Sequence, residues 1–142
     1  MDGPISEALL VTLFMFIESI AGYPPPVERP EIHRLPVEAI AERVCGRPCR
    51  VRAAYISGEG ILIDDSLDIE QHAFAQSVLL HELVHAAQDR DGAFSDLPDC
   101  RRHTQREYEA YWVQGEYLQR TVGSSFDGLD NGDRLRPRCF DE

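Results

Sequence analysis

The sequence predicts an α+β fold that is mostly helical, with a small antiparallel β-hairpin beside one long buried helix. Residues 77–87 would be apolar on nearly every side of a helix, which is typical of a helix inside the core. Residues 50–56 and 61–63 have the composition of short strands and flank the turn sequence Ser57-Gly58-Glu59-Gly60. The 142 residues suit one domain, which we expect to span residues 1–142 with its core at about 36–122.

The first expected element is an amphipathic helix over residues 5–21. Its apolar residues recur at helical spacing, at Leu10, Leu13, Phe14, Ile17 and Ile20. Glu7 and Glu18 flank the apolar block where a signal peptide would begin with basic residues. The block is also too short to cross a bilayer, so we expect no membrane span.

A short helix and the hairpin come next. Pro36 suits the first turn of a helix over residues 37–44, which Gly46 then ends. The strands at 50–56 and 61–63 are expected to pair with each other in antiparallel fashion. Two strands alone are not stable, so a helix should pack on this hairpin.

The central helix is expected to begin near Asp68, because Asp68 and Gln71 have the spacing of a capping box. It should run to about residue 90, where Gly92 supplies a glycine C-cap. Most of the apolar run at residues 77–87, together with the polar residues inside it, therefore falls on one helix.

A last helix is predicted between Thr104 and Gly123, with Thr104 and Glu107 at capping-box spacing. Its expected buried stripe contains Tyr108, Tyr111, Trp112, Leu118 and Val122. Residues 123–142 are polar and rich in turn-forming residues, so we expect a C-terminal tail there.

His81-Glu82-Leu83-Val84-His85 is the most specific motif in the chain. Two histidines four residues apart lie on one helix face, so each can give one ring nitrogen to the same zinc ion. Glu82 lies about 100° further round the helix, beside the water that such an ion would hold. We therefore expect one Zn²⁺ per chain, with His81 and His85 as ligands and Glu82 as general base. The simpler alternative is a pair of core histidines bonded to the backbone, with Glu82 paired to an arginine.

A catalytic zinc needs a third protein ligand, and the last helix offers Glu107, Glu109 and Glu116. Glu107 is assigned to the capping box. Glu109 lies deeper in the helix, beside Trp112 and Val113, and is the expected ligand, with Glu107 as the alternative. Glu116 shares the face of Glu109 and is expected to support the ligands. The other interpretation is that all three form a solvated charged face.

Together these segments resemble a known family. The sequence H-E-L-V-H-A-A-Q at 81–88, followed by R-E-Y-E-A-Y at 106–111, is similar to small gluzincin-type zinc metallopeptidases. It is more similar to a bacterial group of zincin-like domains, a pattern that Ile61-Leu62-Ile63-Asp64-Asp65 also matches, and the resemblance covers residues 50–120. It implies a zincin-like fold and a peptidase that uses the ligands and base named above. It also implies that a peptide or protein substrate aligns on the outer hairpin strand.

Peptide hydrolysis would also need a donor that stabilises the oxyanion. His103, Tyr108 and Tyr111 are the candidates, and the sequence does not choose among them. Two other classes of function stay open. One is a zinc-stabilised binding or scaffold module, closed if Cys100 were a fourth ligand, and the other is a hydrolase of non-peptide amides. The small size of the chain leaves little room for substrate pockets, so a protein partner is also considered.

The net charge bears on the partners of the protein, and the cysteines bear on its cellular compartment. A net charge of −11 argues against nucleic-acid binding, which requires a basic surface. The four cysteines pair most simply as Cys45–Cys49 and Cys100–Cys139. Disulfides favour an exported protein, periplasmic or secreted, whereas four free thiols would favour the cytoplasm.

Overall fold

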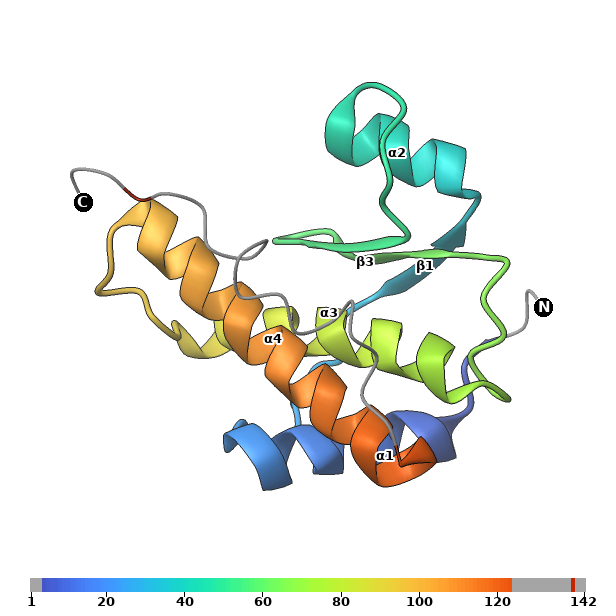
Figure 1. Ribbon diagram of the computed structural model, residues 1–142, viewed down its shortest axis with the longest axis horizontal. Helices are drawn as coiled ribbons and strands as arrows, with labels where there is room; N and C mark the ends of the chain where they lie inside the picture. Colours follow the sequence, from blue (N-terminus) through green and yellow to red (C-terminus); the bar gives the residue numbers. More distant parts are fainter. Residues whose placement is uncertain (1–3, 124–138, 140–142) are drawn as a thin grey trace.

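The computed structural model describes residues 4–123 and Cys139, which form an α+β fold (Figure 1). This part of the chain contains four helices and a three-stranded mixed sheet, so the predicted α+β class is confirmed. The elements in chain order are α1 (Glu7–Ala21), β1 (Ile32–Leu35), α2 (Val37–Cys45), β2 (Ala53–Ile56), β3 (Gly60–Asp64), α3 (Ala73–Asp91) and α4 (Asp99–Val122). Most of the predicted tail at 123–142 lies outside the described residues.

Helix α3 is the centre of the fold, with α4 packed across it and the sheet on its other side (Figure 1). It is apolar on nearly every side, as predicted, and four of its apolar residues are at most 1% exposed: Leu79, Leu80, Leu83 and Val84. Helix α2 covers the face of the sheet opposite α3 (Figure 1). Helix α1 adds Leu13, Phe14 and Ile17 to the core, which therefore begins well before residue 36.

The sheet has the strand order β1-β3-β2. The predicted antiparallel hairpin is confirmed as β2 and β3, whereas β1, which runs parallel to β3, was not predicted. Gly60 allows β1 to approach, because its φ is +114° and a Cβ atom there would lie 2.4 Å from the Glu31 carbonyl oxygen. Since β3 is the middle strand, β2 forms an edge of the sheet beside α3.

Both capping-box predictions are wrong. Helix α3 begins at Ala73 because the chain turns at residues 68–72, where the Asp68 carbonyl accepts the His72 N–H at 3.0 Å. Helix α4 begins at Asp99, so Thr104 lies inside it and its hydroxyl donates to the Cys100 carbonyl at 2.9 Å. Glu107 is therefore not a capping residue.

The buried face of α4 also differs from the prediction. Trp112 and Val122 are each 51% exposed, although Leu118 is buried as expected. The observed buried residues of this helix are Thr104, Ala110, Val113, Gln114, Tyr117 and Leu118. The aromatic residues at 108–112 thus do not form the main contact with the core.

The predicted disulfides are both present, as Cys45–Cys49 and Cys100–Cys139. No cysteine is left free, so Cys100 cannot close a metal site as a thiolate. Within the described residues, no helix combines the length and the apolar character needed to cross a membrane.

We expect protein from an oxidising compartment to contain no alkylatable thiol before reduction. Cys100–Cys139 spans 39 residues and should add about 4 kcal/mol to the free energy of unfolding, against about 2 kcal/mol for the shorter Cys45–Cys49 loop. Urea unfolding of the Cys100→Ser/Cys139→Ser and Cys45→Ser/Cys49→Ser pairs measures both values. Four reactive thiols in unreduced protein would contradict the pairing.

Asp64, at the end of β3, joins the hairpin to the following turn. Its carboxylate is 3% exposed and accepts hydrogen bonds from Arg52 Nε at 3.0 Å and from Ser66 N at 2.9 Å. Burial by itself raises the pKa of Asp64, but the donors on Ser66 and Arg52 together outweigh it and hold the pKa below its ordinary value.

We therefore expect Asp64→Asn to lower the free energy of unfolding at pH 7 by about 1–3 kcal/mol. A carboxyl group whose folded pKa is lowered stabilises the protein fully above its unfolded pKa, about 3.9, and loses this effect as the pH falls through the folded pKa. The difference between wild type and variant should thus shrink in urea titrations as the pH is taken from 5 toward 2. An equal difference at every pH would show that charge is not the cause.

Candidate metal centre

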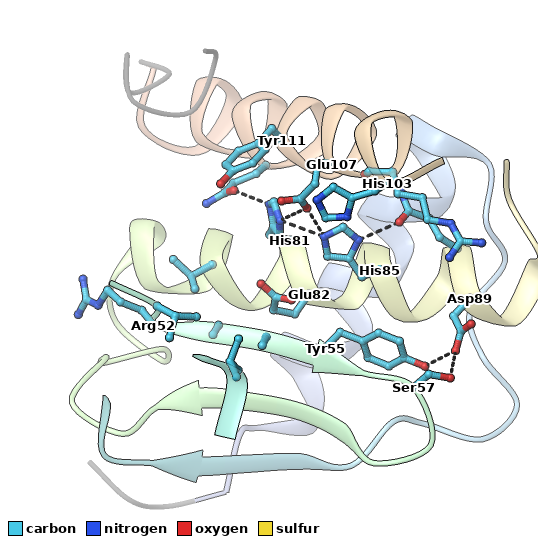
Figure 2. Close-up of a pocket in the computed structure, with 18 of the residues that line it drawn as sticks. Arg52, Tyr55, Ser57, His81, Glu82, His85, Asp89, His103, Glu107 and Tyr111 are labelled. Carbon is cyan, nitrogen blue, oxygen red and sulfur yellow. Dashed lines mark hydrogen bonds and ion pairs between the residues drawn. The ribbon is translucent and has the colours of Figure 1, made fainter. Parts of the chain in front are cut away.

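Two histidines of α3 and one glutamate of α4 meet between the two helices (Figure 2). His81 Nε2 lies 3.2 Å from His85 Nε2. Glu107 Oε1 lies 3.1 Å from the first nitrogen and 2.5 Å from the second. The side chains are only 9%, 19% and 21% exposed for His81, His85 and Glu107. Three ligand atoms of the kind that bind zinc thus lie around one point.

A chain of hydrogen bonds fixes the tautomer of His81. The Ser77 hydroxyl donates to the Phe74 carbonyl at 2.6 Å and so accepts from Gln114 Nε2 at 3.1 Å. The Gln114 amide oxygen must then face His81 Nδ1, which lies 3.0 Å away. Nδ1 therefore carries the proton, and Nε2 has its lone pair directed at the common point.

His85 is held in the same way. Gln88 Nε2 donates to the Arg106 carbonyl at 2.9 Å and to Glu109 Oε1 at 3.0 Å, and both are acceptors only. The Gln88 oxygen consequently accepts from His85 Nδ1 at 2.8 Å. The Tyr23 hydroxyl donates to the same Glu109 oxygen, so Glu109 is part of the support for His85.

These positions fit a zinc ion. Zn–N distances of about 2.0–2.1 Å with tetrahedral angles place neighbouring ligand atoms about 3.3 Å apart, close to the measured 3.2 and 3.1 Å. The 2.5 Å contact between Glu107 and His85 is shorter, so this oxygen would have to sit further from His85 when an ion is bound. Burial raises the pKa of Glu107, but the two adjacent histidines together outweigh burial and lower the pKa overall, which keeps the carboxylate charged.

Glu82 is a separate carboxylate beside this group. It is 7% exposed and lies between α3 and β2, below the two histidines in Figure 2. Burial raises the pKa of Glu82, and the nearby histidines reduce this effect without reversing it. The backbone N–H of Tyr55 in β2 is near its carboxylate and lowers its pKa slightly.

A cleft of about 690 Å³ opens on the group and is lined by β2 together with α3 and α4. The Asp64 N–H donates to the Arg52 carbonyl, and Ala54 lies opposite Leu62 in the register of β2 and β3. In an antiparallel pair only every second residue exchanges hydrogen bonds with the partner strand, so Arg52 and Ala54 bond to β3. The alternate residues, Ala53 and Tyr55, direct their backbone groups to the outer side of the strand, where Tyr55 meets Glu82. The edge strand thus forms one wall of the cleft.

The structure therefore groups His81, His85 and Glu107, the alternative third ligand, and does not place Glu109 with them. His103 and Tyr111 line the cleft on either side of Glu107, and the Tyr111 ring packs edge-on against the His81 ring at 4.4 Å (Figure 2).

Two expected site residues lie elsewhere. Tyr108 lines a separate surface depression with Trp112. Glu116 pairs with Arg120 at 3.3 Å on the surface, so it supports neither histidine. Both differences arise because α4 turns a different face toward the core from the one that was predicted.

Gln88 and Gln114 bond to the two histidines, and neither of them was given a role at the site from the sequence. A usable signal existed, because His103, Glu107, Tyr111 and Gln114 recur at helical spacing and line one cleft. Within the described residues, no second group of three histidine, cysteine or acidic side chains has a comparable arrangement.

Comparisons with protein-family models, curated proteins and solved structures give no match for this chain. The similarity to gluzincin-type peptidases consequently rests on the motif residues. What this site can do chemically is therefore judged from the arrangement of side chains around His81 and Glu82.

Proposed function

We propose that this protein is a zinc-dependent peptide hydrolase with a zincin-like site. His81, His85 and Glu107 would hold the ion, and Glu82 would act as general base. The observation that carries this proposal is the convergence of two histidine lone pairs and one carboxylate beside a second carboxylate. A structural zinc site is usually closed by four protein ligands and has no use for an additional buried acid.

Zinc in such a site supplies an acidified water and polarises the scissile carbonyl group. Glu82 lines the cleft beside the Tyr55 backbone, from where it could accept the proton of that water. The same carboxyl can later return the proton to the leaving amine. Tyr111 and His103 are the two cleft residues suited to donate to the oxyanion.

The edge strand β2 supports a peptide as the substrate. A peptide that adds to a sheet edge gains main-chain hydrogen bonds, and its alternate side chains enter pockets. The backbone groups of Ala53 and the carbonyl of Tyr55 are directed away from β3 and toward the cleft. An extended peptide along them would pass beside Glu82 and the histidines. The two disulfides support an oxidising location, periplasmic or secreted, for this activity.

Metal analysis joined to a protease assay tests the proposal. Protein purified without added metal should contain one zinc per chain and should cleave denatured casein. A chelator should abolish both, and added zinc should restore both. A zinc content below about a tenth of an equivalent after zinc loading would overturn the metal site, since such sites bind tightly near neutral pH.

A further inference from the structure

Two arginines line one end of the cleft. Arg50 and Arg52 precede β2, and Figure 2 shows Arg52 at the end of the strand opposite Ser57 and Asp89. The chain has a net charge of −11, yet residues 43–58 contain four arginines and no acidic residue. This end of the cleft is therefore locally basic in an acidic protein, which favours an anionic ligand there.

Both arginines retain unused donors. Arg52 is held by one bond, from Nε to Asp64 at 3.0 Å, and its side chain is 52% exposed. Within the described part of the chain its two terminal nitrogens have no acceptor, and Arg50 has neither a hydrogen bond nor an ion pair. A guanidinium fixed at Nε presents its terminal nitrogens as a fork that matches the two oxygens of a carboxylate.

The other end of the cleft carries the acidic side chain of Asp89, with the Arg106 guanidinium close to it. Asp89 accepts hydrogen bonds from the Tyr55 hydroxyl at 2.7 Å and from the Ser57 hydroxyl at 2.8 Å (Figure 2). The same contacts lower the pKa of Asp89, with the bond from Tyr55 having the larger effect, and the Arg106 guanidinium is close enough to lower this pKa as well. A peptide paired antiparallel to β2, the more stable arrangement, would run from Asp89 toward the arginines. Its amino side would meet the acid and its carboxyl side would meet Arg50 and Arg52.

We propose that Arg50 and Arg52 form a subsite for a substrate carboxylate on the carboxyl side of the bond presented to the metal centre. This proposal rests on the proposed peptide hydrolysis for the location of that bond. The carboxylate is either an Asp or Glu side chain or the C-terminus of the peptide. Both present the same two oxygens to the guanidinium groups, so the test must separate them.

Binding to zinc-loaded Glu82→Gln protein tests the subsite without requiring turnover. Three labelled peptides of one sequence are compared by fluorescence anisotropy: Glu near an amidated C-terminus, Gln near an amidated C-terminus, and Gln near a free C-terminus. We expect one or both carboxylate peptides to bind about tenfold more tightly than the neutral one at low salt. The tighter of the two identifies the source of the carboxylate. Equal affinities, or no binding of any peptide, overturn the proposal.

Arg50→Gln should remove most of this preference. It breaks no contact of the described structure, so it should fold normally. Arg47→Gln is the matched control, because Arg47 is exposed on the same loop and does not line the cleft. A preference that survives both Arg50→Gln and Arg52→Gln would overturn the assignment. Selective binding without cleavage by the wild type would leave the subsite standing and would refute the peptidase proposal.

Discussion

Glu107→Ala should weaken zinc binding about a thousandfold, whereas Glu109→Ala should weaken it only about tenfold. Glu107 Oε1 is one of the three candidate ligand atoms, at 3.1 Å from His81 Nε2. Glu109 acts at a distance, because its oxygen accepts from Gln88, which orients His85. Loss of a ligand removes a metal bond, while loss of Glu109 only loosens one imidazole.

Competition with a fluorescent zinc chelator at pH 7 measures both affinities. His81→Ala and His85→Ala should resemble Glu107→Ala, and urea unfolding of each variant controls for loss of the fold. Glu116→Ala is a surface control and should bind zinc like the wild type, because Glu116 pairs only with Arg120. If Glu109→Ala were the more damaging variant, the third ligand would be Glu109 and the grouping in the structure would be wrong.

The choice between these two glutamates shows where the sequence failed. Thr104 and Glu107 have capping-box spacing, which assigned Glu107 to a helix terminus. The helix starts earlier, at Asp99, directly after Pro98, and Thr104 lies inside it and bonds back to Cys100. A five-residue error in one boundary therefore favoured Glu109 over Glu107, the glutamate that the structure groups with the two histidines.

Local sequence patterns predicted that α3 is a buried helix, but they predicted little about which other elements pack against it. The apolar run around Leu79 to Val84 was sufficient to predict a buried helix, and the hairpin was predicted from its turn. Strand β1, with the sequence Ile-His-Arg-Leu, is short and has no alternating pattern, so only its pairing with β3 defines it. Trp112 was expected inside because it falls on the predicted apolar stripe, but burial depends on the rotation of α4, which tertiary contacts set.

Glu82→Gln should retain one zinc per chain and lose peptide hydrolysis by a factor of about 10²–10⁴. The amide keeps the shape of the side chain and an oxygen that can still lie near the Tyr55 N–H. It cannot take a proton from water in the cleft. Metal content, unfolding in urea and the rate of casein cleavage are measured on the same preparation, so a loss of activity with zinc intact isolates the base.

Tyr111→Phe is the comparison that separates the effect of Glu82 on activity from the effect of a neighbouring cleft residue. It keeps the ring that packs against His81 at 4.4 Å and removes only the hydroxyl, so a smaller loss of activity is expected if Tyr111 is the oxyanion donor. Equal cleavage by wild type and Glu82→Gln would mean that hydrolysis belongs to a contaminant or another site. A wild-type protein that binds zinc tightly and cleaves no peptide would instead favour a zinc-stabilised binding module. In that case Glu82 would serve the fold, by packing α3 against the edge of the sheet near the Tyr55 N–H.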